Sequence, residues 1–90
     1  MRKSLKSPEY ERLIQVLVAV RKSAKVQQQV LAKKLGRPQS FIAKYEGGER
    51  RIDVVEFIAI ARALGADPVK LFREFVEEKP SKPDRKRGSN

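Results

Sequence analysis

Residues 31–53, LAKKLGRPQSFIAKYEGGERRID, combine amide, hydroxyl and cationic side chains around one short apolar pattern. Ile42 and Tyr45 recur at helical spacing, so they would face a core. The other side of the same helix would present small or polar side chains, namely Gln39, Ser40, Ala43 and Lys44. In the DNA major groove an amide can bond adenine, and an ammonium group can donate to guanine. This side is therefore a candidate for base recognition, led by Gln39 and Lys44; a merely solvated helix face is the alternative.

Cationic and aromatic side chains surround this helix. Arg37 precedes it, and Arg50 and Arg51 follow it, where guanidinium groups would contact phosphates or the neighbouring minor groove. Loop arginines that are only solvated are the alternative. Phe41 would either pack against the preceding helix, the commoner role of an aromatic residue, or contact a thymine methyl as a secondary base-reading residue.

The composition favours an anionic partner and excludes much enzyme chemistry. Lys and Arg number 21 against 11 Asp and Glu, which gives a net charge of +10 over 90 residues. The chain has no Cys and no His, so disulfides, a thiolate nucleophile, imidazole acid–base chemistry and the usual zinc ligands are excluded. We expect no enzyme, no cofactor and no metal site. A basic surface that serves solubility alone is the alternative to a specific anionic partner.

The chain length suits one domain, and no segment has the pattern of a membrane span. No apolar run approaches the roughly 20 residues that such a span needs. The first residues, MRKSLKSPEYER, are charged where a secretory signal would be apolar. We expect a cytoplasmic protein with a basic N-terminal arm (1–7), one domain (8–78) and a basic, disordered C-terminal tail (79–90).

Start and stop signals divide this domain into five helices and no strands. A cap followed by proline, Ser7-Pro8, begins the first helix, and Asp53 with Glu56 has the spacing of a capping box. The expected helices span 8–24, 27–35, 39–46, a segment between Asp53 and Gly65, and 68–78. The fourth, VVEFIAIARAL, should be the most buried. In the fifth, one apolar stripe contains Val69, Phe72, Phe75 and Val76.

This compact, all-α pattern resembles the lambda-repressor-like DNA-binding fold of the XRE or Cro/CI-type helix-turn-helix regulators. The similarity covers roughly residues 13–75, with a steep joint between the second and third helices. The matching positions are Val26, Gln28, Leu31-Ala32, Leu35-Gly36, Gln39-Ser40, Ile42, Tyr45-Glu46, Gly48, Ala61 and Leu64-Gly65. The departures from the family pattern are Lys25 for a frequent Gly, Gln27 for a Thr cap, and Pro38 for a Ser or Thr cap.

The resemblance implies roles for residues outside the exposed helix face. Gln27 and Gln28 occupy positions where family members bond the phosphate backbone at a helix N-terminus. Arg21 and Glu46 match positions that often form a buried salt bridge in this family, which would tie the third helix to the first.

The resemblance also implies a homodimer, because family members usually bind palindromic DNA as two-fold dimers. The fifth helix would supply the interface through Phe75 and Val76, while Phe72 would close the core; closure of the core by all three is the alternative. The implied function is a small bacterial or phage-type transcriptional regulator on double-stranded DNA, most simply a repressor. The main alternative is an antitoxin that binds a toxin protein and regulates its own operon; a nonspecific nucleic-acid coat is another. Neither a small-molecule ligand nor a membrane partner is expected.

Overall fold

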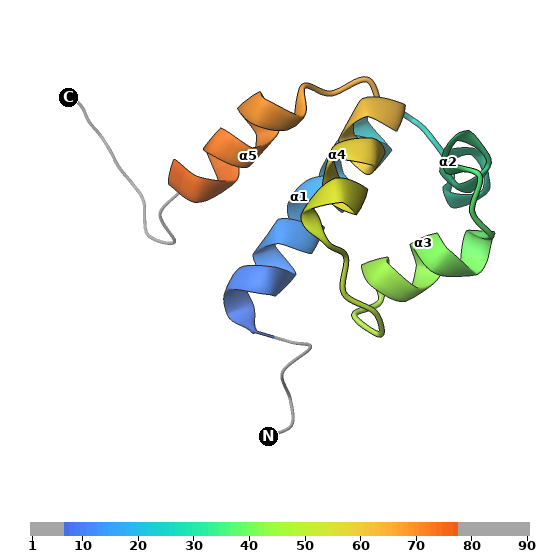
Figure 1. Ribbon diagram of the computed structural model, residues 1–90, viewed down its shortest axis with the longest axis horizontal. Coiled ribbons are helices and arrows are strands. Elements are labelled where there is room, and N and C mark those ends of the chain that lie inside the picture. Colours follow the sequence, from blue (N-terminus) through green and yellow to red (C-terminus); the bar gives the residue numbers. More distant parts are fainter. Residues whose placement is uncertain (1–6, 78–90) are drawn as a thin grey trace.

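The computed structural model describes residues 7–77, which form five α-helices joined by short turns and loops (Figure 1). They are α1 (Pro8–Ser23), α2 (Gln28–Leu35), α3 (Gln39–Glu46), α4 (Val54–Ala63) and α5 (Pro68–Glu77). The described residues contain no strand, so the all-α prediction is confirmed. The first three helices begin and end within one residue of their expected bounds. Apart from Ser7, the predicted arm lies outside the described residues, as do the tail and the predicted end of the fifth helix.

Side-chain caps begin two of the helices where the sequence predicted them. At α1, the Ser7 hydroxyl accepts a hydrogen bond from a first-turn backbone N–H (3.1 Å). At α4, Asp53 accepts from the Glu56 N–H (2.7 Å), and the Glu56 carboxylate accepts from the Asp53 N–H (3.0 Å). Gln27 and Pro38 stand at the N-cap positions of α2 and α3 and supply no side-chain cap. No N-cap side chain therefore satisfies the first N–H groups of these two helices, although the Phe41 N–H of α3 donates to the Pro38 carbonyl (3.0 Å).

The ends of α1 to α4 share one backbone geometry, a Schellman motif around a residue with positive φ. In three of them that residue is a glycine: Gly36, Gly48 or Gly65. At the end of α1 it is Lys25, with a φ of 60°. The Lys25 N–H donates to the Lys22 carbonyl (2.9 Å), and the Val26 N–H donates to the Arg21 carbonyl (3.1 Å). A side chain with a Cβ is disfavoured in this conformation, so Lys25 introduces local strain.

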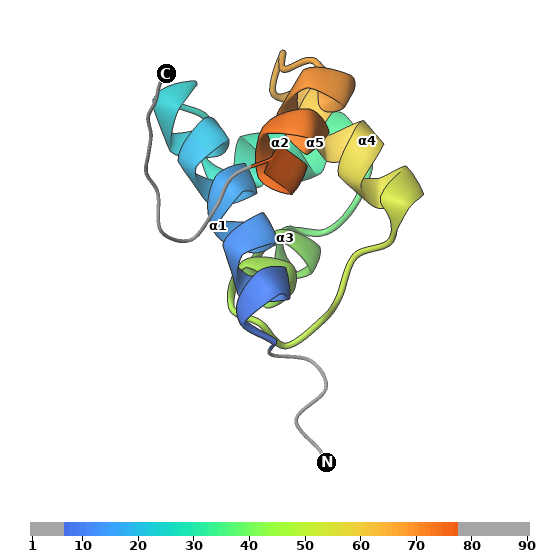
Figure 2. The same cartoon turned by 90° about the vertical axis from the view of Figure 1, so that its left-hand side faces the viewer.

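The core lies where α1 to α4 meet. Its largest fully buried side chains are Leu17, Leu31, Ile42, Tyr45 and Ile60. α2 packs against α3 and α4, α3 packs against α1, and α5 packs against α1 and α4. α3 and α5 lie on opposite sides of the bundle in Figure 1, and Figure 2 views the molecule from the side of α5.

The fifth helix contributes to the core through Leu71, which is 7% exposed, and not through the predicted stripe. Val69, Phe72 and Val76 are exposed. The prediction that Phe72 closes the core is therefore wrong, because Phe72 is 49% exposed. Its ring is edge-on to the ring of the buried Phe57, with centroids 6.0 Å apart. The predicted apolar stripe exists, but α5 is turned about its axis so that Leu71, and not this stripe, faces α1 and α4.

The first turn of α4 also differs from the prediction. Val54 and Val55 are 69% and 73% exposed, whereas Phe57, Ile60 and Ala61 are buried. The sequence predicted that α4 would be the most buried helix. This prediction is wrong for the first turn of α4, because only one face of the helix meets α2 and α5.

Candidate nucleic-acid interface

The second and third helices form a helix-turn-helix. Only residues 36–38 separate α2 from α3, and the Arg37 N–H donates back to the Ala32 carbonyl (3.0 Å). Ile42 and Tyr45 are buried, as predicted, so the opposite face of α3 points outward. That face carries the polar and small residues expected to read bases, all of them exposed: Gln39, Ser40, Ala43 and Lys44.

A chain of side-chain hydrogen bonds orients Gln39. Its Nε2 donates to Oε1 of Gln28 (3.3 Å), and Nε2 of Gln28 donates to Oε1 of Glu46 (2.9 Å). Glu46 can only accept, so it fixes which end of the Gln28 amide faces it and thereby presents Oε1 to Gln39. The Gln39 amide keeps its own Oε1 and one N–H for a further partner.

Arg21 and Glu46, the pair suggested by the resemblance, form a two-pronged ion pair. Nε of Arg21 donates to Oε2 (2.7 Å) and Nη2 to Oε1 (3.0 Å) of Glu46, while Nη1 donates to the Val26 carbonyl (2.8 Å). The two side chains are only 11% and 10% exposed. Hydrogen bonding to Glu46 raises the pKa of Arg21 above its usual value, so the guanidinium stays charged. The pair fastens the end of α3 to α1 and to the start of α2.

Arg37 and Arg50 converge on Glu56 from the two ends of α3. Nη1 and Nη2 of Arg50 donate to Oε1 (3.1 Å) and Oε2 (3.0 Å) of Glu56, and Nη1 of Arg37 lies 3.5 Å from Oε2. Hydrogen bonding from Arg50 lowers the pKa of Glu56 to about 2, so the carboxylate is ionised at neutral pH. Both arginines remain more than a third exposed, and neither is a free cation.

Phe41 lies in the core, the role that the sequence favoured over contact with a base. Its ring is edge-on to Tyr45 (centroids 5.4 Å apart). The guanidinium carbons of Arg37 and Arg50 lie 4.0 and 4.8 Å from the ring centroid. The residue is only 6% exposed, so little of the ring is left to meet a thymine methyl.

The remaining residues expected to contact phosphates are exposed. Arg51 places its guanidinium carbon 4.2 Å from the ring centroid of Tyr10. The Tyr10 hydroxyl accepts a hydrogen bond from the Ile52 N–H (3.0 Å), which ties the loop after α3 to α1. Gln27 is exposed at the start of α2.

Comparison with known proteins decides the class of this domain. A helix-turn-helix family model (HTH_3) matches residues 17–71. The chain is also similar to a solved structure, an XRE-family like protein from Pseudomonas syringae pv. tomato str. DC3000. The identity is 42% and the TM-score 0.77, over 80% of this chain and 88% of that chain. Comparison with curated proteins gave no match.

The chain belongs to the XRE family of helix-turn-helix proteins. This confirms the predicted family and the lambda-repressor-like fold. It also makes the protein a DNA-binding transcriptional regulator at the level of its family.

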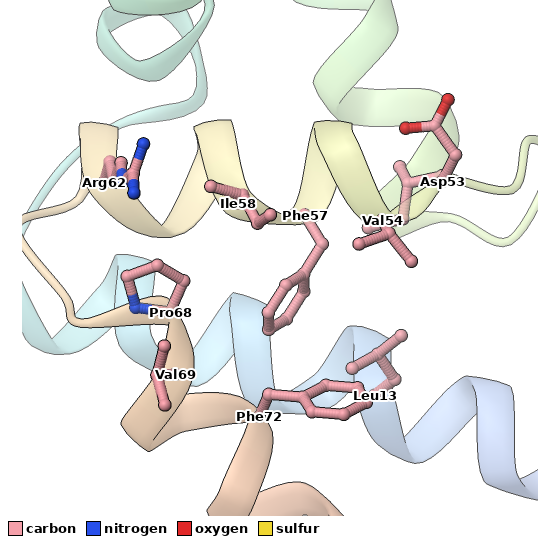
Figure 3. A pocket seen from close by; sticks show the side chains of 10 residues that line it. Leu13, Asp53, Val54, Phe57, Ile58, Arg62, Pro68, Val69 and Phe72 are labelled. Carbon is pink, nitrogen blue, oxygen red and sulfur yellow. The ribbon is translucent and has the colours of Figure 1, made fainter.

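This XRE-family domain has an apolar groove between α1, α4 and α5 (Figure 3). Its volume is about 350 Å³. The apolar side chains that line it include Leu13, Val54, Phe57, Ile58, Val69 and Phe72. The ring of Phe57 projects from α4 toward Phe72 on α5, and the two ring centroids are 6.0 Å apart.

The two residues expected at a dimer interface differ in their surroundings. Val76 is 60% exposed. Phe75 is half-buried, because the guanidinium carbon of Arg12 lies 4.5 Å from its ring centroid and Nη1 of Arg12 donates to its carbonyl (3.1 Å). Arg12 thus covers one face of Phe75 and fastens the last described turn of α5 to α1.

The sequence identified Glu56 only as part of a helix cap. It did not predict that Glu56 pairs with Arg37 and Arg50. The local signal, an acid three residues after Asp53, is fully explained by the capping box. Its pairing with Arg50 depends on the path of the loop between α3 and α4, and its approach to Arg37 depends on how α2 packs on α4. Neither is visible in the spacing of the residues.

Among residues 7–77, no helix has the length and apolar character that a membrane span requires. Within residues 7–77, no three His, Cys, Asp or Glu side chains gather as metal ligands would.

Proposed function

We propose that this XRE-family protein is a sequence-specific repressor that binds a palindromic operator in double-stranded DNA as a homodimer. The exposed face of α3, on which Gln39 is held by Gln28, supports this most directly. An α-helix fits the major groove, where base edges offer donors and acceptors to side chains of these types. In the bacterial cytoplasm such a protein would bind nucleoid DNA and exclude polymerase from a promoter.

The residues of α3 divide into two kinds. Gln39 and Lys44 would specify bases, since an amide can bond adenine through two atoms and an ammonium group can donate to guanine. Ser40 is adaptable, and Ala43 leaves room for the approach of a base pair. Gln28 accepts only one of the two amide hydrogens of Gln39. The Oε1 and the second N–H of Gln39 therefore remain available for the two hydrogen bonds that adenine can form.

Other side chains would position the protein on the backbone of DNA. Gln27 and Gln28 lie at the start of α2, where backbone N–H groups and the helix dipole favour a phosphate. Arg37, Arg50 and Arg51 lie on the turn and loop that flank α3. Contacts of this kind fix register and carry most of the salt dependence, but they do not select sequence.

The proposed homodimer would use the side of the molecule away from α3. Val76 remains in the proposed interface, and Phe72 is added to it because half of its surface is exposed beside the apolar groove. Phe75 would contribute less, since Arg12 covers one face of its ring. Two copies joined here would leave both α3 helices free to reach half-sites about 34 Å apart.

The antitoxin alternative draws on the same apolar groove. A toxin protein could occupy the surface that a second copy would otherwise cover, while α3 still bound the operator. Co-purification of a small protein encoded by a neighbouring gene would favour this alternative over a simple repressor.

The test of base reading is a selection from random duplexes with the purified protein at about 150 mM salt, where purely electrostatic binding is weakened. We expect a palindrome to be enriched. Lys44→Ala should relax the preference at one symmetric base pair. In each half-site, the discrimination between the preferred base and the others should fall by about 1–3 kcal/mol at that position. A selection without any motif, or a Lys44→Ala variant that weakens all sequences equally, would rule out base reading by α3.

A further inference from the structure

Glu56 binds two arginines that the proposed function assigns to DNA. Arg50 uses both terminal nitrogens on the carboxylate (3.1 and 3.0 Å), and its Nη1 also donates to the Arg51 carbonyl (2.7 Å). Arg37 approaches the same carboxylate at 3.5 Å. One carboxylate thus offsets part of the positive charge on both flanks of α3, where a phosphate would otherwise be attracted.

Glu56 does not depend on these arginines for its hydrogen bonding. Its Oε1 accepts from the Asp53 N–H (3.0 Å) as part of the capping box. The carboxylate is 17% exposed, so water can replace a departing guanidinium. Removing Arg37 or Arg50 from it would therefore leave no buried charge without a partner.

The arginines can also leave without disrupting the core. Their side chains are 39% and 38% exposed, and each lies over the ring of Phe41. Contact with an aromatic face is sustained over a range of guanidinium positions, because it depends on distance from the ring and not on one hydrogen-bond direction. A guanidinium could turn from the carboxylate to a phosphate while it stays on Phe41.

We propose that Glu56 competes with DNA for Arg37 and Arg50: it restrains both side chains in the free protein and releases them to phosphates when DNA binds. This inference rests on the proposed function. Each released arginine exchanges the carboxylate for a phosphate. Its phosphate contact therefore contributes less binding free energy than the contact of an arginine with no partner in the free protein. Glu56 then lowers the affinity for every DNA sequence by a similar factor and keeps weak nonspecific complexes from accumulating.

The test is the full-length Glu56→Gln variant. Gln keeps the capping-box hydrogen bond but carries no charge. The matched control is Glu74→Gln, which changes the net charge equally on α5, away from α3. Kd is measured for a random duplex and for the selected operator between about 50 and 200 mM salt.

We expect Glu56→Gln to bind both duplexes about 3- to 10-fold more tightly at the lowest salt, with the same preferred sequence. The slope of log K against log salt should steepen by about one, because wild type must break ion pairs that partly offset the counterions released from DNA. Glu74→Gln should change neither quantity by more than about 2-fold.

A double-mutant cycle tests whether the effect runs through the arginine. Arg50→Ala should weaken DNA binding more in the Glu56→Gln background than in wild type, because only there is Arg50 fully available. Equal losses in the two backgrounds would contradict competition for Arg50.

Two results separate this inference from the proposed function. If wild type binds its operator but Glu56→Gln behaves like Glu74→Gln or binds more weakly, Glu56 does not compete, and only this inference fails. If no protein binds any duplex, the proposed function fails and the inference with it. Thermal unfolding checks that the variant is folded. Should it not fold, Glu56→Asp, whose carboxylate is one carbon further from both arginines, takes its place with the same expected direction.

Discussion

The carboxylate of Glu46 accepts hydrogen bonds from Arg21 on α1 and from Gln28 on α2. It therefore has two roles at the residue scale. As a partner of Arg21 it belongs to a charge pair that has lost most of its water, so each member depends on the other. As a partner of Gln28 it determines how the amide of Gln39 is presented on α3. The stability of the domain and the proposed base contact thus share one side chain.

Arg21→Met removes the guanidinium from this pair but keeps much of its packing volume. The Glu46 carboxylate, 10% exposed, would retain Gln28 but lose its ionic partner. We expect the free energy of unfolding to fall by about 3 kcal/mol, as for other pairs broken on one side in a poorly solvated site. Urea denaturation, followed by circular dichroism, measures this loss.

The control is Lys22→Met, an exposed neighbour on α1, which should change stability by less than about 0.5 kcal/mol. Arg21→Met combined with Glu46→Leu should recover much of the loss, because it removes the unpaired charge. A single variant that costs no more than the control would mean that the pair is effectively solvated.

At the scale of the elements, four helices end in the same backbone motif, but the chain supplies three glycines and one lysine for it. The left-handed conformation costs a residue with a Cβ roughly 1–2 kcal/mol relative to glycine. Lys25, with a φ of 60°, bears that strain between α1 and α2. The motif persists there because Arg21 and its neighbours fix both sides of the turn.

Lys25→Gly should stabilise the protein by about 0.5–1 kcal/mol. It relieves the strained φ, and the gain is reduced by the greater backbone freedom that glycine has in the unfolded chain. The measurement is the shift of the urea midpoint at unchanged slope. Lys22→Gly, three residues earlier and inside α1, should instead destabilise by about 0.5–1 kcal/mol. A Lys25→Gly variant less stable than wild type would show that the lysine side chain makes a favourable contact that outweighs its strain.

The helices were predictable because their signals are local. Ser7, Asp53 and the glycines act on backbone groups a few residues away, so the ends of the elements follow from short stretches of sequence. The face of α5 was not predictable in this way. Its apolar stripe is periodic, but whether Leu71 or Phe72 points inward depends on how α1 and α4 present their surfaces.

The candidate site likewise has one part that local sequence predicts and one part that it does not. The outward residues of α3 follow from the inward spacing of Ile42 and Tyr45, a local pattern within eight residues. The convergence of Arg37 and Arg50 on Glu56 joins three separate segments, so only the assembled fold shows that these arginines already have a partner.

At the scale of the whole molecule, the apolar groove is lined by residues of α1, α4, α5 and the segment before α4, and by none of α3. One domain offers few base contacts, and each mismatched base pair typically costs only about 1–3 kcal/mol. Two joined copies double those contacts without enlarging the chain. A surface that joins copies must leave α3 uncovered, and the exposed stripe of α5 meets this condition.

Phe72→Ser tests whether that stripe holds the proposed homodimer together. Phe72 is 49% exposed and borders the groove, so its loss removes apolar area from an interface while Leu71 continues to anchor α5. We expect wild type to sediment as a dimer and the variant as a monomer at the same concentration. Binding of the variant to a palindrome should weaken by about 10-fold or more, whereas binding to a single half-site should change little.

Val30→Ser is the control, since Val30 is 44% exposed on α2 and does not line the groove. It removes a similar kind of exposed apolar side chain and should leave the dimer intact. A Phe72→Ser variant that stays dimeric would place the interface elsewhere. If wild type is itself monomeric, yet binds the palindrome no better than one half-site, each domain acts alone. The groove would then remain for a different protein, which is the arrangement that the antitoxin alternative requires.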